Sequence, residues 1–263
     1  MGMKRGAAAL TVVTGVMLFA SVASADPLSK GQMVEMLETI DARQRAAGDY
    51  KALVLIDQKQ KGKAELVYEA VIYRRDEQGK LLILFLKPKS ESGKGYLRLE
   101  KNLFMYDPSV GKWERRTDRE NIGGTNSQRR DFDATSFARD YSPAYVAEEK
   151  LGKFGVHHIL LEQKDGSEVA YPKMHVWVDK ASGNVLKVQE YASSGKLMRT
   201  SYYPKWSKVK SSETGGHLYF PKEIRIFDEV EKGNSTTIVM QKVDLKKLDD
   251  NIFTKAWLES KSR

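Results

Sequence analysis

Four histidines and no cysteine are the side chains from which nucleophilic or metal chemistry would have to be built. His157 and His158 are adjacent on a predicted strand, so they point to opposite faces and cannot ligate one metal together. His175 and His217 also fall on predicted strands. The sequence contains no G-x-S-x-G elbow, H-E-x-x-H helix or phosphate-binding P-loop. We therefore expect no catalytic residues, no metal and no cofactor, with a hydrolase as a minor alternative.

The first 25 residues are built like an export signal. Lys4 and Arg5 form a positive head, residues 7–22 are mainly apolar, and Ala23-Ser24-Ala25 has the small-residue pattern of a cleavage site. The apolar run is short for a span of about 20 predominantly apolar residues, which favours cleavage over an uncleaved anchor. We expect residues 1–25 to be a signal peptide. The mature chain would be a soluble exported protein, and without a cysteine it cannot be lipidated at its N-terminus.

The charge balance is basic, with 44 Lys and Arg residues against 35 Asp and Glu and a formal net charge of +9. Loss of the two signal-peptide charges would leave the mature chain at +7. The charges are interspersed, and no Lys/Arg block of the nucleic-acid-binding type occurs. We expect no nucleic-acid partner. An anionic lipid or an acidic protein fits the charge better, and a surface that is merely soluble is the alternative.

Residues 28–46 have the spacing of an amphipathic helix, with Met33, Met36, Leu37 and Ile40 on one face. Ser29 followed by Gln32 predicts a capping box at its start. From residue 50 the period changes to two, and turns rich in Gly separate the strand patterns that recur as far as residue 244. A sheet of about ten antiparallel strands must curl. We therefore expect one mainly β domain over residues 26–263, with the helix covering the concave face.

Strand alternation assigns a second set of apolar residues to the inner face. Aromatic and methionine side chains are numerous, with 12 Tyr, 9 Phe, 4 Trp and 9 Met, which fits either an ordinary sheet core or an apolar cavity for acyl chains. With the helix stripe, the residues expected to line this cavity are Met33, Met36, Leu37, Ile40, Val54, Ile56, Leu66, Tyr68, Ile72, Leu97 and Leu99.

Residues 117–150 interrupt the strand pattern, and the insertion at 117–141 carries Gly123-Gly124. A long irregular insertion in a β domain is usually functional or disordered. We expect it to form a mobile rim that binds phosphate headgroups or an acidic partner, with a solvated linker as the alternative. The residues assigned to this rim are Arg115, Arg116, Arg119, Arg129 and Arg130.

The order of parts and several motifs resemble the LolA-like outer-membrane lipoprotein-sorting proteins of the bacterial periplasm. The motifs are Tyr73-Arg74-Arg75, residues 82–88, Gly93-Lys94-Gly95-Tyr96-Leu97, Phe104-Met105-Tyr106-Asp107-Pro108, Arg115-Arg116, residues 124–133, Ser136-Phe137-Ala138 and Tyr202-Tyr203. The resemblance implies an incomplete antiparallel β-barrel covered by an N-terminal amphipathic helix and short loop helices.

The resemblance also implies a monomeric periplasmic carrier. It would bind acyl chains of a lipoprotein or lipid in an apolar half-barrel and deliver them to an inner-membrane transporter or an outer-membrane acceptor. The alternative is a sensor domain of the same fold, which would bind lipid or protein without transporting it.

Overall fold

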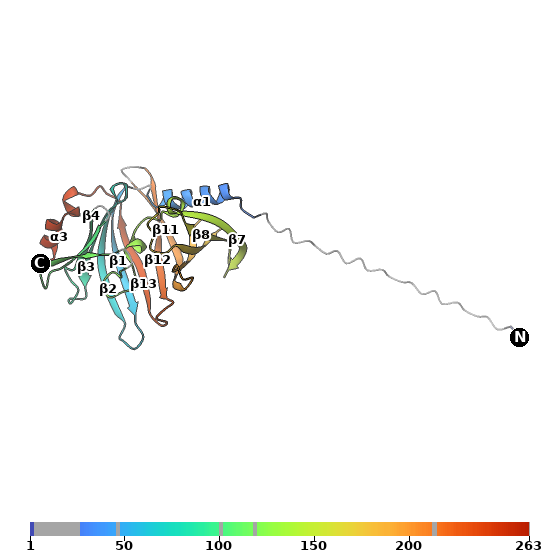
Figure 1. Cartoon of the computed structure of the whole chain (residues 1–263), viewed down its shortest axis with the longest axis horizontal. Coiled ribbons are helices and arrows are strands. Elements are labelled where there is room, and N and C mark those ends of the chain that lie inside the picture. The colour runs from blue at the N-terminus through green and yellow to red at the C-terminus, as the bar shows by residue number, and fades with distance from the viewer. Residues whose placement is uncertain (3–26, 46–47, 100–101, 118–119, 212–214, 263) are drawn as a thin grey trace.

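The computed structural model describes residues 1–2, 27–45, 48–99, 102–117, 120–211 and 215–262 (Figure 1). The predicted signal peptide and its cleavage site therefore lie almost entirely outside the described residues. None of the helices in the described part is both long and apolar enough to cross a membrane.

Strands dominate the described chain, and the helices are few and short. The strands are β1 (Asp49–Lys59), β2 (Leu66–Arg75), β3 (Lys80–Lys87), β4 (Gly95–Leu99), β5 (Asn102–Asp107), β6 (Lys112–Arg116), β7 (Tyr141–Leu151), β8 (Phe154–Gln163), β9 (Lys173–Asp179), β10 (Val185–Tyr191), β11 (Leu197–Lys210), β12 (His217–Asp228) and β13 (Ser235–Asp244). The helices are α1 (Lys30–Arg43), α2 (Phe137–Asp140) and α3 (Lys255–Lys261), with single 3₁₀ turns at η1 (Asp76–Gln78), η2 (Arg129–Phe132) and η3 (Asp250–Phe253).

The strands form one antiparallel, strongly curved sheet in the order β6-β5-β4-β3-β2-β1-β13-β12-β11-β10-β9-β8-β7 (Figure 1). It consists of two meanders, β1–β6 and β7–β13, joined where β1 pairs with β13. The expected mainly β, curved antiparallel fold is confirmed. The expectation of about ten strands is too low, partly because β7 lies almost entirely within residues 117–150, where the sequence shows no strand pattern. As an edge strand with many exposed polar residues, β7 gives little apolar alternation.

Topology explains the irregular segment before β7. β6 and β7 are consecutive strands, yet they lie at opposite edges of the sheet, so the connection between them must cross it. Residues 120–137, here called the crossover segment, lie inside the curve and not on its rim as expected. Ile122 and Phe132 are buried in the concave core. The Gly123 amide donates a hydrogen bond to the Tyr96 hydroxyl (2.8 Å), and the Asn126 amide donates one to Thr236 Oγ1 (2.8 Å).

Helix α1 begins as predicted, at a capping box in which Ser29 and Gln32 bond each other's backbone groups. Its buried residues Met33, Leu37 and Ile40 pack on the second meander, against side chains such as Ile159 and Val176. The expectation that this stripe lines one cavity with Val54 and Ile56 of the first meander is therefore wrong, because the two sets belong to separate cores. The other end of α1 holds the crossover: Asp41 accepts hydrogen bonds from Thr135 Oγ1 and from the amides of Phe137 and Ala138, at 2.6, 3.1 and 2.9 Å.

The predicted inner face of the first meander is correct in part. Val54, Ile56, Tyr68 and Ile72 are buried in the concave core. Leu66 lies near the end of the β1–β2 hairpin and is 39% exposed.

Leu97 and Leu99 lie on the outer face, so their inward assignment needs correction. They pack there with Phe253 of η3 and Leu258 of α3. The C-terminal segment covers this part of the outer face, so the apolar side of β4 is the outer one, and Tyr96 and Arg98 lie inward. Alternation identifies the apolar side of β4, but that side is not the inner face.

Candidate functional site

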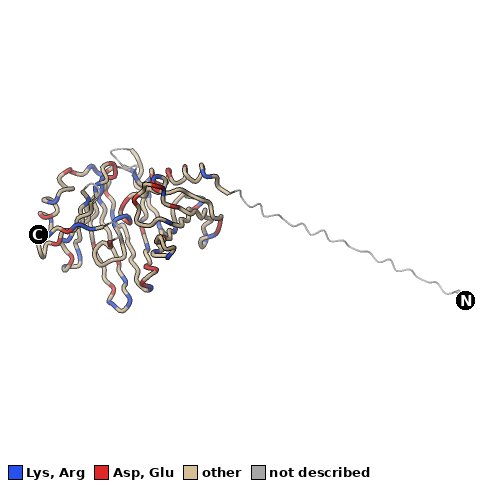
Figure 2. The backbone as a smooth tube through the Cα atoms, viewed as in Figure 1, with Lys and Arg blue, Asp and Glu red and all other residues tan. Residues whose placement is uncertain are grey.

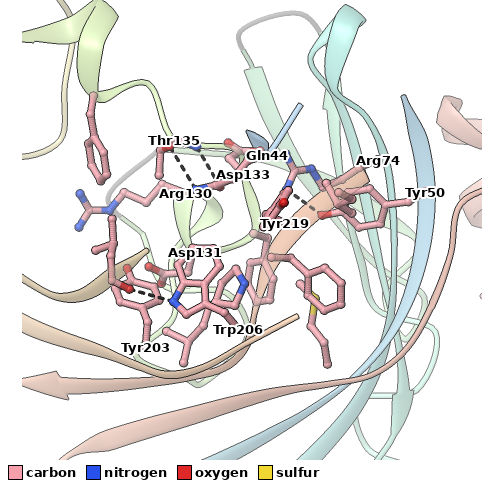
Figure 3. Close-up of a pocket in the computed structure, with 18 residues that line it drawn as sticks. Gln44, Tyr50, Arg74, Arg130, Asp131, Asp133, Thr135, Tyr203, Trp206 and Tyr219 are labelled. Carbon is pink, nitrogen blue, oxygen red and sulfur yellow. Dashed lines mark hydrogen bonds between the residues drawn. The ribbon is translucent and has the colours of Figure 1, made fainter. Parts of the chain in front are cut away.

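A small apolar cavity lies between the crossover segment and the strands of the second meander. Its volume is about 50 Å³. Its apolar lining comes from β10, β11, β12, β13, the crossover segment and α2: Val185, Tyr203, Trp206, Leu218, Phe220, Ile224, Met240, Phe132 and Phe137. In Figure 3, Tyr203 and Trp206 lie along the lower side of the cavity, and Gln44, Asp133 and Arg74 lie along the upper side. The cavity thus has an apolar floor and a polar upper wall.

A larger polar cleft of about 550 Å³ adjoins this upper wall and shares Arg74, Arg130 and Asp133 with the cavity. We call it the arginine cleft. Its charged lining residues are Arg45, Arg74, Arg98, Arg129, Arg130, Arg139, Asp76, Glu77, Asp133, Asp140 and Glu168. Figure 2 shows basic and acidic residues interspersed along the described chain. The site is therefore amphipathic: an apolar space opens beside a polar, arginine-rich one.

A buried ion-pair network fastens the crossover segment to the second meander. Arg199 on β11 donates to Asp131 (2.7 Å) and to Gln128 (3.0 Å), and its side chain is 6% exposed. Arg130 pairs with Glu190 on β10 at 2.7 Å and lies over the Tyr171 ring, 4.2 Å from its centroid. Loss of one partner from a buried pair leaves an uncompensated charge, so removing Asp131 or Arg199 alone should loosen the attachment of the crossover segment.

The first meander contributes a second group of charged residues. Arg98 on β4 donates through one nitrogen to both oxygens of Asp133, at 2.9 and 2.8 Å. Arg129 is 3.5 Å from the same carboxylate. Arg74 on β2 bonds Asp76 and donates to the Tyr50 hydroxyl at 2.7 Å. The crossover segment is thus tied by charge to both halves of the sheet.

Burial dominates the electrostatics of these groups. It raises the pKa of Tyr50 to about 12, although the Arg74 charge opposes the rise. It also raises the pKa of Tyr203, which lies against the cavity. Burial lowers the pKa of Arg98; the Asp133 charge is the largest opposing influence, and the charges of Arg129 and Arg74 add to the lowering. Arg98 therefore lies in a desolvated environment.

The arginines assigned to a rim occupy different places. Arg115 is exposed on β6, and Arg116 pairs with Glu114 (2.6 Å) and Glu120 (3.1 Å). Arg119 lies outside the described residues. Arg129 and Arg130 line the arginine cleft, with side chains 18% and 22% exposed. The structure therefore does not bring the four described arginines together.

Of the residues expected to line an acyl cavity, none lines the cavity now described, although several contribute to the cores beside it. Met36 is half-buried beside the core under α1. Sequence reasoning missed Arg74, Arg98 and Arg199. For Arg74 the sequence contained a signal, because this residue follows Ala70 and Ile72 at the next inward position of its strand. A charged residue in an inward position of a curved sheet marks a polar interior.

His157 and His158 point to opposite faces, as the strand pattern predicts. His158 Nε2 lies 2.7 Å from His175 Nδ1 across the outer face, and His157 packs on Tyr145. Within the described ranges, no group of three or more His, Cys, Asp or Glu side chains could hold a metal ion.

A model of a protein family matches residues 77–260, and the description of that family is "Uncharacterized protein". The chain belongs to this family. No curated protein matches it.

Three solved structures show the fold of this family member. A LolA superfamily protein from Nitrosomonas europaea is 23% identical with a TM-score of 0.70, over 85% of this chain and 97% of the other. A putative outer membrane lipoprotein-sorting protein domain from Vibrio parahaemolyticus is 20% identical with a TM-score of 0.73, over 86% and 97%. A DUF1329 family protein from Desulfovibrio piger is 17% identical with a TM-score of 0.77, over 89% and 100%. The fold is therefore LolA-like.

Proposed function

We propose that the protein is a non-catalytic periplasmic carrier, which binds acyl chains of a lipoprotein or lipid on the concave face of its single half-barrel domain. The observation that supports this is the amphipathic interior, in which an apolar cavity opens beside the arginine cleft. The Vibrio protein with the same fold is named as a lipoprotein-sorting domain, which supports a lipoprotein as cargo. Delivery would be to an inner-membrane transporter or an outer-membrane acceptor.

The size of the cavity constrains how such cargo is bound. Each buried CH₂ group of an acyl chain contributes about 0.8 kcal/mol, so a concave apolar face can hold a chain firmly. Pockets for small ligands usually enclose about 300–1,000 Å³, whereas this cavity has about 50 Å³. Ile122, Phe132 and Phe137 of the crossover segment occupy part of the concave face beside it. Binding an acyl chain therefore requires these apolar side chains to make room for it.

A fluorescent fatty-acyl probe tests the proposal. Met240 faces the cavity and Val239, its neighbour on β13, is half-buried on the outer face. Met240→Glu would place a carboxylate where the acyl chain lies, and burying it unpaired is costly. We expect Met240→Glu to abolish probe uptake and Val239→Glu to retain it. Absence of probe binding by the wild type would contradict the carrier proposal.

A sensor of the same fold is the second candidate, and the ion-paired closed interior favours it, because binding would then change the shape of the molecule. Transfer between vesicles separates the two functions. A carrier moves labelled lipid from donor to acceptor vesicles, whereas a sensor binds the probe without accelerating transfer.

A further inference from the structure

We infer that the arginine cleft holds the anionic headgroup of the bound amphiphile, with a phosphate ester as the chemistry that fits it best. This inference rests on the proposed carrier function and adds the class of its ligand. The headgroup would then bind in the interior of the molecule and not at the rim that the sequence suggested.

The position of the cleft supports a headgroup site. Arg74, Arg130 and Asp133 line both the cavity and the cleft, so the two spaces meet at these side chains. An acyl chain lying on the apolar floor would therefore place its polar end among the arginines. The cleft, at about 550 Å³, has room for a phosphate headgroup without rearrangement.

Arg98 supplies donors for such a group. A guanidinium has five N–H donors in a planar fork that matches phosphate. In Arg98 only one terminal nitrogen is bonded, to Asp133, and the buried Nε has no hydrogen-bond partner among the described residues. The side chain is only 10% exposed, so water compensates little for the missing bonds. Unsatisfied donors beside an open cleft are suited to an incoming oxyanion.

The carboxylates in the cleft do not block an anion. Asp76 is bonded by Arg74, and Asp133 is shared by Arg98 and Arg129. Asp140 is bonded by Arg139 at the mouth.

The two remaining acids of the cleft, Glu77 and Glu168, are exposed to solvent, where water screens their charge. Arg45 also reaches the mouth, where it donates to the Thr135 carbonyl at 2.6 Å. The pKa of Arg98 is lowered mainly by burial, a cost to its charged form that a bound anion would offset.

Competition against the fluorescent acyl probe tests the headgroup. Lysophosphatidic acid, lysophosphatidylcholine and monoacylglycerol of one chain length differ only in the head. We expect lysophosphatidic acid to displace the probe at a concentration about tenfold below that of monoacylglycerol, the order of one charge-assisted hydrogen bond. Inorganic phosphate alone should displace nothing, because it lacks the acyl chain.

Two variants place the preference in the cleft. Arg98→Gln should reduce the preference for the phosphate head about tenfold while binding of monoacylglycerol is kept, which a folding defect would not produce. If Arg98→Gln does not fold, Arg45→Gln at the exposed mouth provides the test, with an expected loss of about threefold. Arg43→Gln is the matched control, because Arg43 lies on the same helix end but bonds the Ser182 carbonyl outside the cleft.

The outcomes separate the two proposals. Equal displacement by all three lipids would overturn the headgroup site and leave the carrier function standing. Displacement by inorganic phosphate at the concentration of the lysolipid would show a free-anion site and also overturn it. If no probe binds to the wild type, the proposed carrier function itself fails.

Discussion

The faces of the two meanders are covered by different elements. In the first meander, the crossover segment covers the inner face, and η3 and α3 cover the outer face (Figure 1). In the second meander, the crossover segment covers the inner face of β12 and β13, and α1 covers that of β8, β9 and β10. Among the described residues, no helix packs on its outer face. A strand covered on both sides is apolar on both sides, whereas an uncovered face must be built from residues that tolerate water.

The outer face of the second meander shows which residues do this. His158 stacks on Trp177 with ring centroids 4.2 Å apart, and Lys187 Nζ lies 4.0 Å from the Trp177 ring centroid. His175 bonds His158, and Tyr191 packs on it edge-on at 5.4 Å. These side chains present apolar surfaces to one another and polar tips to solvent. Where no helix covers the outer face, amphipathic side chains therefore form it in place of a bare apolar surface.

The largest expected effect is the loss of stability when the packing of α3 on the outer face of the first meander is weakened. Leu258 of α3 is fully buried against the outer face, so Leu258→Ala should lower the free energy of unfolding by about 3 kcal/mol. Phe227→Ala on the uncovered outer face, where the side chain is 40% exposed, should cost less than about 1 kcal/mol. Urea unfolding measures both. Equal losses would mean that the two outer faces are covered equally well.

A smaller effect distinguishes the crossover segment from the strands on which it packs. Ile122 of the crossover segment and Ile83 of β3 are both fully buried in the concave core. Ile→Val at either position should lower stability by about 1 kcal/mol. If the crossover segment moves on binding, Ile122→Val alone should raise acyl-probe affinity, by up to about fivefold, because it weakens only the closed state. An equal affinity change in Ile83→Val would show that the segment does not move separately.

The smallest expected effect concerns the histidines of the uncovered face. Burial lowers the pKa values of His158 and His175, although Glu149, 3.0 Å from His158 Nδ1, partly opposes this. Below about pH 6.5 the unfolded chain therefore takes up these protons before the folded chain does. Stability is kept above that pH and falls as the pH drops toward the folded pKa values.

Thermal unfolding between pH 7 and pH 5 measures this loss. The double variant His158→Gln/His175→Gln should lose less stability over the same range, because it has no imidazoles there to protonate. An identical pH dependence in the variant would assign the loss to other groups.

The sequence predicted helix α1 accurately because its signals are local. The stripe of Met33, Leu37 and Ile40 and the box of Ser29 with Gln32 depend on residues three or four apart. Alternation also placed Val54, Ile56 and Ile72 on the inner face correctly. It failed for Leu97, because the C-terminal helix that covers the outer face comes about 160 residues later in the chain.

The strands and the capped helix could be predicted from the sequence, because periodicity and capping patterns depend on residues only a few positions apart. Tertiary structure decided what lies inside the curve. Pairing of β1 with β13 puts β6 and β7 at opposite edges, so the connection between them must cross the concave face. That crossing brings Asp131 to Arg199 and Asp133 to Arg98, pairs 68 and 35 residues apart that no local pattern could join.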